Sequence, residues 1–152
     1  MLSNEKLIVL MKNITVFSDL SNEQLRELTH YLFLKAVEND QYLFKEGDVG
    51  DFLCFVVSGK LSVLKEGEGK SIEVATLTEG DVLGEIAVID GEPRSASVRA
   101  TSHSHVVVLR KDQFDLMHES HPDISYAVVK GIARSLSQRL RSATINALHL
   151  HS

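Results

Sequence analysis

The chain has 152 residues, a formal net charge of -5 and a single cysteine, Cys54. Its 43% hydrophobic and 24% charged residues are typical of an ordinary globular domain and exclude disordered and fibrous proteins. The acidic balance argues against nucleic-acid binding, and a lone cysteine excludes an internal disulfide, so we expect one cytoplasmic domain over residues 1–152.

The N-terminal part, residues 1–31, is predicted to be helical. Its apolar run "LIVLM" is followed at once by a lysine and is too short for a signal peptide or a membrane span. Ser21 and Gln24 have the spacing of a capping box. Three leucines follow at helical spacing: Leu25, Leu28 and Leu32. We therefore expect a helix behind Ser21 and no contact with a membrane.

Residues 31–110 alternate short apolar stretches with turn signals. The apolar stretches include "YLF", "FLCFVV", "LSVL", "IEVATL" and "HVVVL", separated by turns such as "EGD", "SGK" and "EGEGK". Because "FLCFVV" and "HVVVL" are apolar at nearly every position, both faces of these strands should be covered. The pattern predicts an α+β, mainly β fold: an antiparallel rolled β-barrel or sandwich of the jelly-roll, double-stranded β-helix kind, flanked by helices.

Residues 111–152 return to a helical pattern. "KDQFDLMHES" predicts a short helix, and Pro122 stands at the first position of a longer one, where its missing N–H costs least. Apolar side chains recur every three or four residues along this helix: Val129, Ile132, Leu136, Leu140, Ala143 and Ala147. Such a stripe must lie on the barrel, on a ligand or on a partner chain.

The stretch "GEIAVIDGEPRSASVRA", residues 84–100, places Glu85 and Arg94 on either side of a short apolar run. A phosphate bound without a metal needs converging backbone N–H groups and a cation. Gly84 allows close approach of the backbone, "EIAVI" can form one helical turn, and Arg94 can donate two hydrogen bonds. Because Glu85 can accept from a sugar hydroxyl, a ribose phosphate satisfies both charges. The alternative is a solvated surface ion pair, worth only about 0 to 1 kcal/mol.

The same stretch resembles the phosphate-binding cassette of the cyclic nucleotide-binding domain family, which includes the bacterial cyclic-AMP receptor protein and the regulatory subunits of protein kinase A. "FSDLSNEQLRELT", "EGDVGDFLCFVVSGKLSV" and "LTEGDVLGE" are similar to the family's entry helix, its glycine-punctuated strands and its approach to the cassette. The resemblance covers nearly all of residues 14–148 and places the cassette at residues 83–97. It implies a regulatory domain that binds cAMP or cGMP, without catalysis, cofactor or metal.

The resemblance also implies roles for the cassette residues. Glu85 would accept the ribose 2'-hydroxyl, Arg94 would pair with the cyclic phosphate, and Gly84 would leave room for the sugar. Three backbone N–H groups would complete the phosphate cradle: those of Ile86, Ala87 and Ala96. Leu83 stands where many relatives have Phe, a change that an apolar pocket should tolerate but that should loosen the sugar contact.

The base end of the site follows from the resemblance as well. Ser95 stands where relatives carry a small residue whose hydroxyl contacts phosphate or base. Val63 and Val74 fall on strands that line the purine pocket in the family. Ser135 and Arg139, four residues apart on the last helix, are placed to contact the base, because this helix closes over it in the family. The closeness of "RSA" to the bacterial receptor's pattern favours cAMP over cGMP.

Two other functions stay open. The fold could serve as a ligand-independent interaction domain, whose terminal stripe drives homodimerisation or docking onto a partner protein. "HSH" at residues 103–105 matches the H-x-H ligand pair of cupin metalloenzymes, but no downstream Glu or later His accompanies it, so a solvated hairpin is the preferred interpretation. The sequence also carries no helix-turn-helix segment after the last helix, so we expect a stand-alone domain that binds no DNA by itself.

Overall fold

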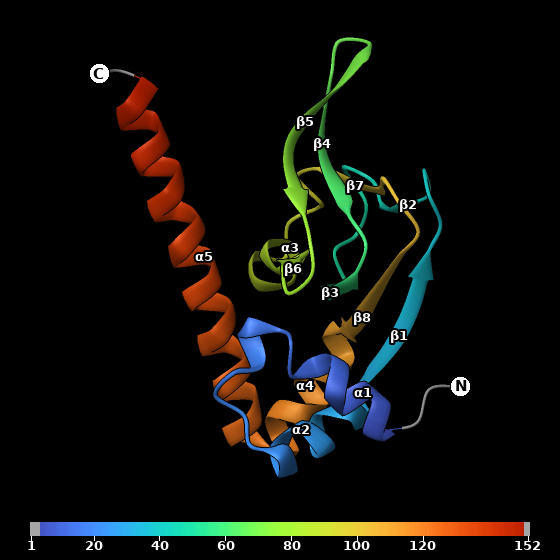
Figure 1. Cartoon of the computed structure of the whole chain (residues 1–152), viewed down its shortest axis with the longest axis vertical. Helices are drawn as coiled ribbons and strands as arrows, with labels where there is room; N and C mark the ends of the chain where they lie inside the picture. The colour runs from blue at the N-terminus through green and yellow to red at the C-terminus, as the bar shows by residue number, and fades with distance from the viewer. Residues whose placement is uncertain (1–3, 151–152) are drawn as a thin grey trace.

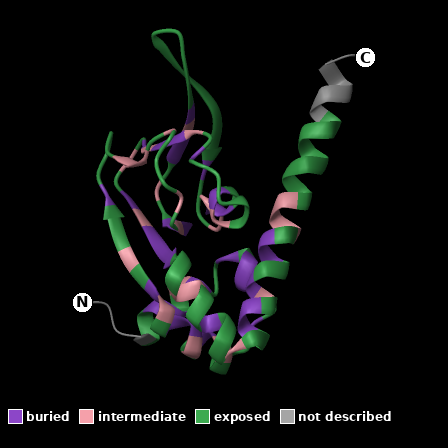
Figure 2. Ribbon diagram, turned by 180° about the vertical axis from the view of Figure 1, so that it is seen from behind, coloured by how far each residue is buried: buried purple, intermediate pink, exposed green. Residues whose placement is uncertain are grey.

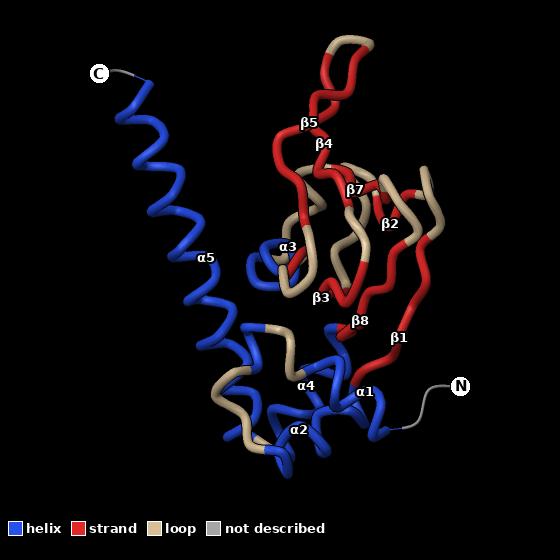
Figure 3. Tube along the Cα trace, in the orientation of Figure 1, coloured by secondary structure: helices blue, strands red, loops and turns tan. Residues whose placement is uncertain are grey.

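The computed structural model describes the backbone of residues 4–150 and the side chains of residues 5–145. Two four-stranded antiparallel sheets form its centre, with short helices gathered at one end and one long helix along the side (Figures 1 and 3). The strand orders are β1-β8-β3-β6 and β2-β7-β4-β5. The predicted mainly β, rolled antiparallel fold is confirmed, although the strands form two sheets rather than one closed barrel.

The N-terminal helices precede the first strand. They are α1 (Asn4–Met11), η1 (Thr15–Phe17), α2 (Asn22–Leu28) and η2 (Thr29–Tyr31). The predicted capping box is present: Ser21 Oγ accepts from the Gln24 N–H at 3.1 Å, and Gln24 Oε1 accepts from the Ser21 N–H at 3.0 Å. The leucine spacing overstated the length of this helix. It ends at Leu28, and Leu32 begins the first strand after the intervening 3-10 turn.

The eight strands occupy most of residues 32–110. They are β1 (Leu32–Val37), β2 (Tyr42–Phe44), β3 (Phe52–Ser58), β4 (Leu61–Gly67), β5 (Lys70–Leu77), β6 (Val82–Leu83), β7 (Ser97–Ala100) and β8 (Ser104–Arg110). β3 shows why "FLCFVV" is apolar throughout. Leu53, Phe55 and Val57 pack into a core shared with the helices, whereas Cys54 and Val56 pack into a second core inside the roll. Successive side chains of a strand point to opposite faces, so both faces of β3 are covered.

The chain ends in α4 (Lys111–Ser120) and α5 (Pro122–Leu150), after the short α3 (Glu85–Asp90) between β6 and β7. Pro122 begins α5, as predicted. Only the middle of the α5 stripe lies on the body: Ile132 is buried and Leu136 half-buried, whereas Val129 is 48% and Leu140 69% exposed. Toward its C-terminal end the helix stands beside the roll and leans away from it (Figure 2). Ala147, the last residue of the stripe, lies outside the described side chains.

Candidate functional site

Two left-handed glycines delimit α3 and set its direction. Gly84 has φ 80° and Gly91 has φ 74°, a conformation that costs an L side chain energy. A Cβ on Gly84 would also lie 2.7 Å from Arg94 Nη1 and 3.2 Å from the Phe52 carbonyl oxygen. Gly84 is therefore required both by its backbone angle and by the arginine that packs against it.

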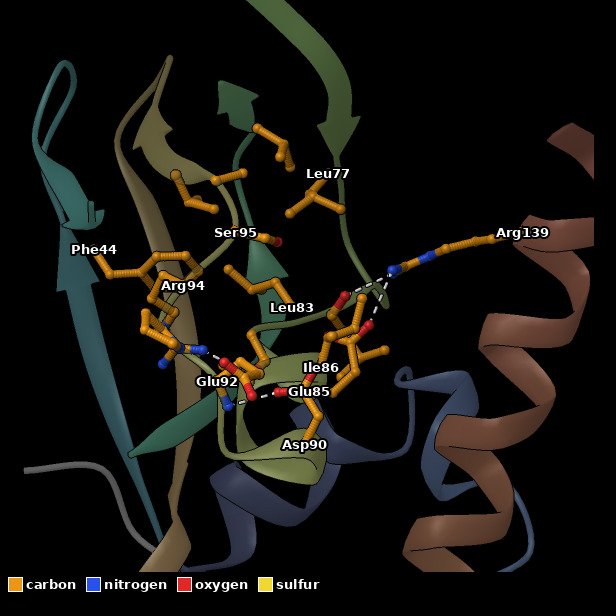
Figure 4. Close-up of a pocket in the computed structure, with 17 residues that line it drawn as sticks. Phe44, Leu77, Leu83, Glu85, Ile86, Asp90, Glu92, Arg94, Ser95 and Arg139 are labelled. Carbon is orange, nitrogen blue, oxygen red and sulfur yellow. Dashed lines mark hydrogen bonds and ion pairs between the residues drawn. The ribbon is translucent and has the colours of Figure 1, made fainter. Parts of the chain in front are cut away.

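A cavity of about 200 Å³ lies between the roll, α3 and the cassette (Figure 4). Its walls come from β2 and β4 to β7, from α3 and its flanking segments, and from one side chain of α5. The lining residues are Phe44, Val63, Leu77, Val82, Leu83, Gly84, Glu85, Ile86, Ala87, Asp90, Glu92, Pro93, Arg94, Ser95, Ala96, Val98 and Arg139.

Arg94 is the buried cation of this cavity, with 3% of its surface exposed. Nη1 donates to the Gly84 carbonyl oxygen at 2.7 Å and Nη2 to the Phe52 carbonyl oxygen at 2.5 Å. The ring centroids of Phe44 and Phe52 lie 4.0 and 4.7 Å from Cζ of its guanidinium. Burial lowers the pKa of Arg94, but a guanidinium stays charged in proteins. Nε is buried and has no partner among the described residues, so both charge and a donor remain for an anion.

Glu85 is the buried acid of the same cavity, with 2% of its surface exposed. Burial raises the pKa of Glu85, while the positive charges of Arg139 and Arg94 act in the opposite direction. Arg139 reaches across from α5: Nη1 donates to Glu85 Oε1 at 3.3 Å, and Nη2 donates to the Val82 carbonyl oxygen at 2.6 Å (Figure 4). The site thus contains one buried carboxylate and two guanidinium groups, with the exposed carboxylates of Asp90 and Glu92 also in its lining, and the buried groups suit a ligand with both hydroxyl and anionic groups.

A family model described as "Cyclic nucleotide-binding domain" matches residues 34–121. The chain belongs to the cyclic nucleotide-binding domain family. This membership confirms the resemblance carried by the cassette sequence.

Relatives and solved structures agree with this assignment. The chain is 38% identical over 104 residues to a cAMP-dependent protein kinase regulatory subunit of Yarrowia lipolytica, which is 68% of this chain and 27% of the relative. A cyclic nucleotide-binding domain from Methylobacillus flagellatus superposes with a TM-score of 0.84 and 30% identity, covering 95% and 82% of the two chains. The Thermus thermophilus catabolite activator protein gives 0.75 and 25%, covering 90% and 63%. The chain thus spans about a quarter of the curated kinase subunit that it matches.

The structure brings most of the residues predicted from the family together around the cavity. The predicted residues that line it are Val63, Leu83, Gly84, Glu85, Ile86, Ala87, Arg94, Ser95, Ala96 and Arg139. Val74 and Ser135 lie outside it. Several lining residues were missed by the sequence analysis. Phe44 is the most important of these, because its ring covers Arg94, yet only the pairing of β2 with β7 brings it there.

Val74 lies outside the cavity, at a bulge in β5. Ala75 pairs with Val63 and Glu73 pairs with Leu64, which leaves Val74 as the extra residue. Leu77 of the same strand lines the cavity, and alternation from Leu77 places Val74 on the opposite face of the sheet. Its side chain is 58% exposed.

Ser135 lies one helical turn before Arg139 and faces a different hollow. That hollow is formed with η1 and the loop before β6, including Thr15 and Asp81. At Gly131, α5 packs directly against η1. Glycine permits this close approach, because a Cβ on Gly131 would collide with the Val16 carbonyl group. Ser135 therefore lies apart from the cavity, while Arg139 contacts Glu85, and a shared contact of the two side chains with one ligand stays a prediction.

The histidines of "HSH" lie on an exposed hairpin. His103 Nδ1 is 3.0 Å from Glu38 Oε2, and His105 Nδ1 is 3.2 Å from Ser58 Oγ. Across the part of the chain that the structure describes, no three His, Cys, Asp or Glu side chains converge as metal ligands. Within the same residues, no helix has the length and apolar character needed to cross a bilayer.

Proposed function

We propose that this protein is a cytoplasmic sensor domain that binds cAMP in preference to cGMP and signals through α5. The observation that carries the proposal is that Glu85 and Arg94, both almost fully buried, line one cavity. A carboxylate for the ribose 2'-hydroxyl and a guanidinium for the cyclic phosphate are the two groups that a cyclic nucleotide requires. The proposal assigns no reaction and no cofactor to the site.

The preference for cAMP is supported by the wall opposite α3, where the base would lie. Val63, Leu77 and Val98 make this wall apolar, and the Ser95 hydroxyl stands at its edge. Guanine carries more polar groups than adenine on the edge that would be buried here, and an unpaired buried polar group is costly. The chain is also similar to a regulatory subunit of a cAMP-dependent protein kinase.

Signalling through α5 is supported by the contact between Arg139 and Glu85. A ribose hydroxyl that bonds to Glu85 shares this carboxylate with Arg139, so an occupied and an empty site hold α5 differently. A ligand shifts the helix only to the extent that it prefers one helix position over the other. Arg139 is the described side chain through which α5 senses the site.

The proposal is tested by parallel calorimetric titrations with cAMP and cGMP. We expect one site per chain and tighter binding of cAMP. Binding of neither nucleotide would overturn the proposed function, and equal binding of both would overturn the stated preference alone.

A second candidate function is supported by the projecting part of α5. Leu140 and Ile145 are exposed there, on a helix that is clear of the body (Figure 2). A ligand-independent domain that dimerises or docks through this segment predicts a mass in light scattering that falls on Leu140→Ser and does not respond to nucleotide. A mass that is unaffected by Leu140→Ser would exclude it.

A further inference from the structure

The carbonyl group of the Ser95–Ala96 peptide is held by a lysine from a neighbouring strand. Lys65 of β4 donates from Nζ to the Ser95 carbonyl oxygen at 2.6 Å and to Glu46 Oε1 at 2.7 Å. Glu46 Oε2 accepts from the Glu66 N–H at 3.0 Å, which ties this carboxylate to β4. The ammonium group of Lys65 is thus fixed between a strand and the cassette.

We propose that Lys65 is a positioning residue for the cyclic phosphate: it orients and polarises the Ser95–Ala96 peptide so that the Ala96 N–H donates to the anion. The inference rests on the proposed function and adds a residue outside the cavity to it. Lys65 does not line the cavity, whereas Ser95 and Ala96 do.

The planar trans geometry of the Ser95–Ala96 peptide bond links the position of the Ser95 carbonyl group to the direction of the Ala96 N–H. In such a peptide the C=O and the following N–H point in opposite directions. When Lys65 holds the Ser95 carbonyl outside the cavity, the Ala96 N–H is directed to the opposite side of that peptide. A cation on the carbonyl oxygen also polarises the peptide, which makes the N–H a stronger donor.

The ion pair of Lys65 with Glu46 indicates that Lys65 acts by positioning the Ser95–Ala96 peptide and not by attracting the phosphate from a distance. Glu46 offsets the charge of Lys65. The pKa of Glu46 is lowered, mainly by the hydrogen bond from Lys65 and to a smaller extent by that from the Glu66 N–H. A neutralised pair in a half-exposed place attracts a distant phosphate weakly. The effect of Lys65 therefore depends on its hydrogen bond to Ser95.

The loop that carries Glu46 holds the cassette at two further points. The Glu46 N–H donates to Ser97 Oγ at 2.9 Å, and the Gly47 N–H donates to the Arg94 carbonyl oxygen at 2.9 Å. Together with Lys65 these bonds fix the backbone from Arg94 to Ser97, the segment that includes the proposed phosphate donor. Of the three donors, Lys65 contributes a charged side chain, and the other two are backbone N–H groups.

The test compares Lys65→Met with Lys70→Met, which removes the same charge from an exposed position at the far end of the same hairpin. Calorimetric titration with cAMP should show a loss of about threefold to tenfold for Lys65→Met, the effect of one weakened hydrogen bond. Lys70→Met should bind within about twofold of the parent, since surface substitutions away from a site have small effects. Lys65→Arg, which keeps a cationic donor, should recover most of the loss.

A spectroscopic measurement separates positioning from loss of structure. In the parent protein the Ala96 amide proton should shift downfield when cAMP is added, and this shift should be smaller in Lys65→Met, with thermal unfolding of the unliganded variants unchanged. Glu46→Gln, which keeps Lys65 but loosens it, should give a smaller loss of affinity and a smaller change of the same signal.

The two levels of the proposal fail in different ways. Parent affinity and an unchanged Ala96 shift in Lys65→Met would overturn the role of Lys65 and leave the proposed function intact. Equal losses in Lys65→Met and Lys70→Met would also overturn it, because charge alone would then account for the effect. A parent protein that does not bind cAMP would overturn the proposed function and this inference with it.

Discussion

Two acid–base pairs in this molecule look alike in distance and differ in surroundings. Glu85 lies 3.3 Å from Arg139 beside the cavity, and Glu38 lies 3.0 Å from His103 on the β7–β8 hairpin. The side chain of Glu85 is 3% exposed, whereas that of Glu38 is 70% exposed. Burying a charge is costly unless partners offset it, while an exposed pair costs and contributes little. Burial beside a cavity therefore distinguishes the charges of the proposed site from surface charges, and a short distance does not.

The largest expected effect comes from the buried cation. Arg94→Ala should weaken cAMP binding about 10- to 150-fold, because a charge-assisted contact worth about 1.5 to 3 kcal/mol is lost. Equilibrium dialysis with labelled cAMP measures the loss. Arg94→Lys should also weaken binding, since the ammonium cannot donate in two directions from one plane. Parent-like affinity in Arg94→Ala would show that the phosphate lies elsewhere.

Neutralising the buried acid should weaken ligand binding without lowering the free energy of unfolding of the unliganded protein. Glu85→Gln should weaken cAMP binding about tenfold, because the acceptor for the 2'-hydroxyl loses its charge. The same change should not destabilise the unliganded protein at neutral pH, since it removes a charge whose burial is unfavourable. Dialysis and urea unfolding of one protein sample measure both effects, and a stable variant with parent affinity would contradict the assigned role.

The pKa of Glu85 gives this second effect a pH dependence. Because burial raises the pKa of Glu85 in the folded state, the folded protein binds this proton more tightly than the unfolded chain does. The stabilisation is present below about pH 4.3, the ordinary Glu value, and is lost as pH rises through the folded pKa. The free energy of unfolding of the parent, measured relative to Glu85→Gln, should therefore fall with rising pH in that window. A difference that rises with pH would contradict it.

A smaller effect tests where the cavity ends. Val63→Ser should weaken cAMP binding about threefold to tenfold through loss of apolar contact, while Val74→Ser should leave affinity unchanged because Val74 is exposed and does not line the cavity. Both substitutions remove the same apolar groups from adjacent strands, so the pair is a matched comparison in one titration series. Equal losses in the two variants would contradict the placement of Val74.

The smallest effect is expected at the exposed pair. His103→Ala should change cAMP affinity by less than about twofold, since the hairpin lies away from the cavity and surface substitutions have small effects. Added divalent metal should not alter the thermal stability of the parent. A stabilisation by metal that is lost in His103→Ala would revive the metal-site interpretation of "HSH".

How much the sequence could predict depended on how local each feature is. Glu85 and Arg94 lie in one continuous stretch, so their type and spacing, together with the family resemblance of that stretch, were sufficient to predict an anion and sugar site. Phe44 lies fifty residues before Arg94, and only strand pairing brings its ring onto the guanidinium. Val74 lies on a predicted strand, but its apolar character alone does not show which face of that strand lines the cavity.

The helical part shows the same limit. The spacing of apolar residues predicted α5 but not where it would leave the body of the protein. Its position depends on the approach of Gly131 to Val16, which separates Ser135 from the cavity and directs Arg139 to Glu85. Contacts between segments far apart in sequence therefore decide which residues of the last helix belong to the site.

A crystal structure of the protein with cAMP tests most directly whether Glu85 and Arg94 serve one ligand. The account predicts electron density for the nucleotide in the cavity beneath β4 and β5, with its cyclic phosphate against Arg94 and its 2'-hydroxyl on Glu85. Nucleotide bound at another surface, with this cavity unchanged, would contradict the account.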